Sequence, residues 1–75
     1  MIAVVITDVD RTFPTVVLLN DVDDVEAAFG KYLRNARNFS DSEIDEGFAY
    51  SPAFKTWSAG RDIQGTYSVF VNVIV

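Results

Sequence analysis

Asp8 and Asp10 are the two residues of this chain whose type and spacing best suit chemistry. They stand two positions apart, directly after the β-branched, apolar residues 2–7. A carboxylate at a strand end can act as a nucleophile, and two hard oxygen donors suit Mg²⁺. The pattern therefore indicates a candidate site for a divalent cation or a phosphate group.

Residues 4–13, with the sequence VVITDVDRTF, resemble the first motif of the haloacid dehalogenase-type phosphatases, a hydrophobic strand that ends in DxDxT. The resemblance implies that Asp8 is the nucleophile, that Asp10 is the general acid/base, and that both help to hold Mg²⁺, with Thr12 in the last motif position. Arg11 stands where that family commonly has Gly, and Pro14 follows at once. The family's doubly wound domain also needs several βα units, more than 75 residues with one long helix can supply. We therefore expect Asp8 and Asp10 to shape a hairpin turn through bonds from side chain to backbone.

The acidic residues are concentrated in the first part of the chain. Residues 1–46 carry ten carboxylates against four bases, a net charge of −6, whereas residues 47–75 carry Lys55, Arg61 and Asp62, a net charge of +1. Phosphate binding requires positive charge on the contacting face, so we expect no direct binding to nucleic acid. A segregated field of one sign points instead to protein partners, solubility and association rate.

The composition also limits the chemistry that is available. The chain has no Cys and no His, so disulfides, nearly all zinc sites and any nucleophile activated by His are ruled out. We expect no enzyme activity, no cofactor and no metal. Asp21, Asp23 and Asp24 form a second acidic cluster, with Glu26 beyond, and helix capping explains it better than a cation does.

Hydrophobic periodicity predicts a single α+β domain over residues 1–75. We expect strands over residues 2–7 and 12–19, with Pro14 at an edge or near the strand start, and a strand over residues 66–75. The clearest element is an amphipathic helix that is capped by Asn20 or Asp21, with Gly30 at a close approach to the sheet. Its apolar stripe consists of Val22, Val25, Ala28, Phe29, Tyr32, Leu33 and Ala36.

The segment after this helix is less regular. Ser40 and Glu43 form a capping box that predicts a short helix over residues 41–46. In residues 48–65, either a short helix begins at Ser51-Pro52 or a strand covers residues 54–58. The expected fold is thus a small antiparallel or mixed sheet of three to four strands with one long helix on one face, in the order β-β-α-(short α or β)-β.

Two groups of residues are candidates for binding a partner. The first consists of carboxylates that could share one surface: Asp23, Asp24, Asp41, Asp45 and Glu46. The second is an aromatic cluster around Tyr50 and Trp57, with Phe48 and Phe54, which either closes the core or anchors an interface. Arg34 and Arg37, near Tyr32 and Phe39, have the look of a basic and aromatic patch, but we interpret them as charges that favour the helix C-terminus.

The leading functional hypothesis is a small acidic protein-binding module that occludes the basic, nucleic-acid-binding surface of a larger protein. In size, charge and lack of motif the chain resembles the small inhibitors, some of them DNA mimics, that phages and mobile elements make against host defence or transcription machinery. The alternative is a structural homo-oligomer, such as a homodimer, with a solubilising acidic face and with self-association through Phe70, Ile74 and part of the first strand. The third is a metal- or phosphate-handling remnant around Asp8 and Asp10. We expect no signal peptide, because residues 1–6 have no basic flank and lead straight into Thr7 and Asp8, and no apolar run has membrane-spanning length. We therefore expect a cytoplasmic protein, in the host cytoplasm if viral.

Overall fold

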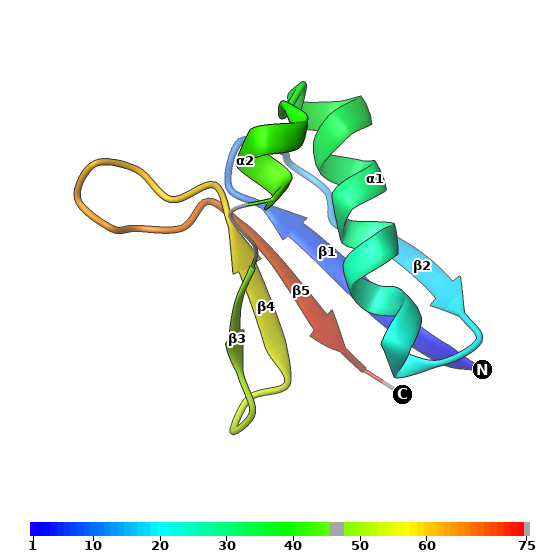
Figure 1. The fold of residues 1–75 in the computed structure, drawn as a ribbon. Coiled ribbons are helices and arrows are strands. Elements are labelled where there is room, and N and C mark those ends of the chain that lie inside the picture. The colour runs from blue at the N-terminus through cyan, green and yellow to red at the C-terminus, as the bar shows by residue number, and fades with distance from the viewer. Residues whose placement is uncertain (46–47, 75) are drawn as a thin grey trace.

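The computed structural model describes residues 1–45 and 48–74, which form one five-stranded antiparallel sheet with helices on one side (Figure 1). The strand order is β2-β1-β5-β4-β3, so that the last strand of the chain lies at the centre of the sheet. The strands are β1 (Ile2–Asp8), β2 (Thr15–Leu19), β3 (Ala49–Ser51), β4 (Thr56–Ala59) and β5 (Val69–Val73). Two hairpins, β1–β2 and β3–β4, therefore flank β5.

Two helices follow the first hairpin. A short 3₁₀ helix, η1 (Val22–Asp24), leads directly into α1 (Val25–Arg37), and α2 (Asp41–Asp45) comes after a turn. The carboxylate of Asp21 accepts a hydrogen bond from the backbone N–H of Asp23 and caps η1, as expected. The capping box is also confirmed, because Ser40 N–H donates to Glu43 and Glu43 N–H donates to the Ser40 hydroxyl.

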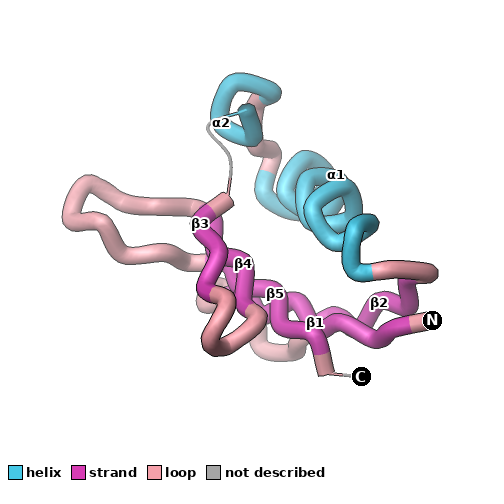
Figure 2. Tube along the Cα trace, turned by 60° about the horizontal axis from the view of Figure 1, so that its bottom comes forward, coloured by secondary structure: helices cyan, strands magenta, loops and turns pink. Residues whose placement is uncertain are grey.

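The core lies between the sheet and α1 (Figure 2). Alternate residues of β1 and β5 point toward the helix, and α1 contributes Phe29 and Leu33, both fully buried. The predicted stripe and the predicted inner face of the last strand therefore pack against each other. The opposite face of the sheet has no helix over it in the described residues.

The structure corrects three expectations about the sheet. It has five strands rather than three to four, because Ala49–Ser51 and Thr56–Ala59 pair as the β3–β4 hairpin and no helix begins at Ser51-Pro52. The second strand begins at Thr15 rather than residue 12, since Pro14 lacks the N–H that a ladder needs. The last strand covers only Val69–Val73, because residues 61–68 form a loop. Expectations for Glu46, Gly47 and Val75 lie outside the described residues.

Gly30 has a different neighbour from the one expected. A Cβ placed on Gly30 would lie 3.6 Å from the Cγ2 of Ile44, an ordinary van der Waals distance, so the close element is α2 rather than the sheet. We expect Gly30→Ala to raise the free energy of unfolding by up to about 1 kcal/mol, since Ala has the higher helix propensity and gains a contact with Ile44. Denaturant unfolding would measure the change. A lower midpoint would show that α2 cannot accommodate the methyl group.

Candidate functional site

Asp8 is buried at the end of β1 and is the centre of a polar cluster. Its side chain is 1% exposed and one oxygen, Oδ1, lies 2.7 Å from a guanidinium nitrogen of Arg37 at the end of α1. The same oxygen accepts a hydrogen bond from the backbone N–H of Asp10, and Oδ2 accepts one from the Tyr32 hydroxyl. Arg37 also lies 3.4 Å from the carboxylate of Asp10. The expected turn-shaping bond of Asp8 is thus confirmed, together with an ion pair that joins strand to helix.

The surroundings of Asp8 favour its charged form. Burial alone would raise the pKa of Asp8, but the hydrogen bonds from Asp10, Arg37 and Tyr32 and the positive charge of Arg37 outweigh it, so the pKa lies below its ordinary value. Burial and the adjacent negative charge of Asp8 raise the pKa of Tyr32. Asp8 is therefore held as a carboxylate and Tyr32 as a neutral donor.

This geometry does not present Asp8 and Asp10 for phosphatase-like chemistry. Both oxygens of Asp8 already accept hydrogen bonds, and the guanidinium of Arg37 occupies the position between the two carboxylates where a shared cation would sit. A nucleophile must be reachable by its substrate, and Asp8 is covered. Arg37 lies in the last turn of α1, as expected, and its ion pairs with Asp8 and Asp10 were not predicted from the sequence.

A sequence signal for this ion pair existed. Asp8 continues the two-residue alternation of the buried Val4 and Ile6, and Arg37 continues the four-residue spacing of Phe29 and Leu33. Both residues thus lie on the core-facing side of their elements, Asp8 at the end of the strand and Arg37 at the end of the helix. Opposite charges in these positions are expected to meet where the helix packs on the sheet.

The carboxylates named as partner-binding residues fall into two groups, one at each end of α1. Asp23 and Asp24 lie in η1, before the first turn of α1, and Asp41 and Asp45 lie in α2, beyond its last turn; all four are exposed. Both groups are on the helix-bearing side of the sheet (Figure 2). In space α2 folds back beside α1, with Ile44 near Gly30 in the middle of that helix and Asp41 paired with Arg34. Glu46 lies outside the described residues.

The two groups differ in how far basic residues neutralise them. Near α2, Arg34 pairs with Asp41 at 3.1 Å, and Arg37 pairs with Asp8 and Asp10. At the other end of α1, no salt bridge is found within residues 1–45 and 48–74 for a set of four exposed carboxylates. We call this set the acidic end: Asp21, Asp23, Asp24 and Glu26. Asp23 and Asp24 were among the predicted partner-binding residues, whereas Asp21 and Glu26 were not.

The aromatic cluster is divided between core and surface. Trp57 is 7% exposed and belongs to the core, and Phe48 packs on Phe29 with ring centroids 4.9 Å apart. Tyr50 lies over Trp57 at a centroid distance of 4.5 Å and is 46% exposed, whereas Phe54, in the β3–β4 turn, is 78% exposed. Of the two predicted aromatic site residues, only Tyr50 is accessible to a partner, with Trp57 beneath it.

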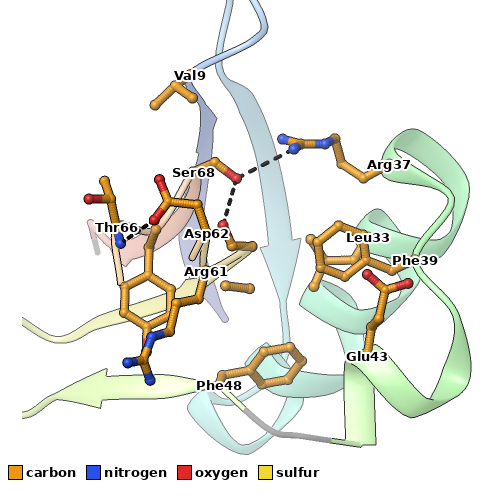
Figure 3. Close-up of a pocket in the computed structure, with 13 residues that line it drawn as sticks. Val9, Leu33, Arg37, Phe39, Glu43, Phe48, Arg61, Asp62, Thr66 and Ser68 are labelled. Atoms are coloured by element: carbon orange, nitrogen blue, oxygen red, sulfur yellow. Dashed lines mark hydrogen bonds between the residues drawn. The ribbon is translucent and has the colours of Figure 1, made fainter. Parts of the chain in front are cut away.

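A hollow lies between the end of α1, α2 and the loop after β4 (Figure 3). It has a volume of about 670 Å³ and an apolar wall that includes Leu33, Phe39 and Phe48. Two of its polar groups already have partners: Arg37 binds Ser68 as well as Asp8, and Asp62 accepts hydrogen bonds from two backbone N–H groups. Arg61 and Tyr67 also line the hollow.

Comparison with models of known protein families, with curated protein sequences and with solved structures finds no match. Within the part of the chain that the structure describes, no helix has both the length and the apolar character needed to cross a bilayer. Nor do three or more potential metal-ligating side chains come together in residues 1–45 and 48–74.

Proposed function

We propose that this protein is a small acidic binding module that covers a basic, nucleic-acid-binding surface of a larger protein. The observation that carries the proposal is the acidic end of α1, where four exposed carboxylates in six residues have no basic partner in the described chain. Carboxylates on a rigid surface resemble phosphates in charge, and they attract a cationic groove over a distance of about 10 Å at moderate salt.

The distribution of the basic residues supports the same assignment. Arg34 pairs with Asp41 of α2 and Arg37 pairs with Asp8 and Asp10 at the end of β1, whereas no salt bridge to the acidic end is found in the described residues. The acidic end is also fixed in place, because η1 is continuous with α1 and Val25, the first residue of α1, is buried. A preformed charged surface loses little conformational entropy when it binds.

The carboxylates of α2 supply a second charged contact. They lie in α2, which packs beside the second half of α1, so a groove that covers this side of α1 would meet both acidic groups. Tyr50, supported from below by Trp57, is the apolar anchor that we assign to the same partner.

Capture from a lysate of the source cell, or of its host, tests this proposal. Immobilised protein should retain one or a few nucleic-acid-binding proteins at low salt, and double-stranded DNA or RNA should displace them, because both ligands occupy the same surface. The Asp23→Lys, Asp24→Lys double variant should retain much less. Bound proteins that nucleic acid does not displace, and that the variant retains equally, would contradict the proposal.

A further inference from the structure

Strand β2 is an edge of the sheet that lacks the usual protection against pairing with another strand. Its residues, Thr15–Leu19, include no charge, and Val16 and Leu18 are 61% and 65% exposed on the face without a helix. Natural proteins commonly protect such edges with charged residues, prolines or very short strands. The other edge, β3, is only three residues long and is followed by Pro52. The backbone donors and acceptors of β2 are therefore those most open to a new strand.

The helix-bearing side of the same edge is also incompletely covered. An open groove of about 450 Å³ lies between β2 and α1, with the side chains of Val17 and Leu19 from the strand and of Ala28 and Ala36 from the helix along it. Lys31 is the one charged residue among those that line it. An additional strand beside β2 would place its own inward-facing side chains at this groove.

The apolar residues of the face without a helix gather at the β2 side. Leu18 and Val16 lie opposite Ala3 and Val5 of β1, whereas the corresponding positions of β4 and β5 include Thr56, Ser58 and Asn72. The apolar surface thus continues from β2 onto β1 and becomes polar toward β4.

We propose that the chain forms a two-fold dimer in which β2 pairs antiparallel with β2 of a second copy, giving one continuous ten-stranded sheet. A second copy suits this edge because an antiparallel strand centred on Val17 is complementary to itself, with Val16 beside the second copy's Leu18. The two chains carry −5 each, and β2 contributes none of that charge. Pairing of the two β2 strands therefore places no like charges next to each other. Higher salt should preserve the dimer, because it screens the repulsion between the net negative charges of the two chains. This inference is independent of the proposed function, whose binding weakens with salt.

Sedimentation equilibrium of the full chain, from micromolar to millimolar concentration, tests the dimer. The apparent mass should rise from 8.3 kDa toward twice that value. The Leu18→Lys variant should keep the monomer mass over the whole concentration range. Electrostatic repulsion would not explain that result, because the substitution lowers the net negative charge of the chain. Ala49→Lys is the matched control, because Ala49 is exposed on β3 at the other edge and the same substitution there should leave the dimer intact.

Hydrogen exchange separates strand pairing from stacking of two sheet faces. In the proposed dimer, alternate amides of β2 become protected as the concentration rises, and those of β3 do not. A monomer mass at millimolar concentration would overturn the proposal. So would a dimer that Phe70→Lys disrupts while the β2 amides stay unprotected and Leu18→Lys has no effect.

Discussion

Replacing Phe29 or Leu33 with alanine is expected to lower the free energy of unfolding by about 3 to 5 kcal/mol, the largest stability effect in this chain. Both side chains are fully buried between α1 and the sheet, and each substitution removes apolar contact and leaves a cavity. A domain of 75 residues has a small margin of stability, so much of either variant should be unfolded at room temperature.

Urea unfolding followed by far-ultraviolet circular dichroism measures this effect. Asn35→Ala is the matched control, because Asn35 lies on α1 but is exposed, and its substitution should change stability by less than about 0.5 kcal/mol. Similar midpoints for the wild type and the Leu33→Ala variant would mean that α1 does not pack through this stripe.

Arg37→Ala should be the second most damaging substitution, at about 3 kcal/mol. It leaves the buried charge of Asp8 without its cationic partner, and removing one member of a buried ion pair is costly. Arg34→Ala is the control, since its partner Asp41 is exposed and such pairs contribute less than about 1 kcal/mol. Equal effects of the two substitutions would show that Arg37 is no more than a surface charge.

The same cluster predicts a dependence of stability on pH. Because folding lowers the pKa of Asp8, the unfolded chain binds more protons than the folded one between the two pKa values. The contribution of Asp8 is therefore complete above the ordinary aspartate pKa of about 3.9 and is lost as the pH falls through the lowered value. The difference in unfolding free energy between wild type and Asp8→Asn should shrink with acidification below about pH 4. A difference that stays constant there would contradict the lowered pKa.

The long-range elements of the fold were predictable where hydrophobic periodicity was strong. The apolar residues of α1 recur with the helical period and those of β5 with the two-residue period of a strand. Both apolar faces must be buried, so their contact could be predicted. Strand β3 has only three residues, Ala49–Ser51, and its pairing with β4 depends on the turn around Phe54 and Lys55. Lys55 has a positive φ of 50°, a conformation that its residue type does not indicate.

The candidate site was predictable in part, because exposure and pairing depend on tertiary structure. The sequence identified Asp23, Asp24, Asp41 and Asp45, but their division between η1 and α2 and the pairing of Asp41 with Arg34 required the fold. The sequence left Trp57 either in the core or as an interface anchor, and its burial depends on the β4–β5 register that places it opposite Val71. Arg37 was interpreted from its position near a helix end rather than from its spacing to Leu33.

The association rate constant with the captured partner, measured by stopped flow over a series of salt concentrations, tests the proposed function most directly. We predict a steep fall with salt and, at low salt, an association rate at least about tenfold lower for Asp23→Lys, Asp24→Lys, with little change in dissociation. The Asp41→Lys, Asp45→Lys variant carries the same change in charge and should lose less, because Arg34 already offsets Asp41. A rate that is independent of salt, or that falls equally in both variants, would contradict a role for the acidic end.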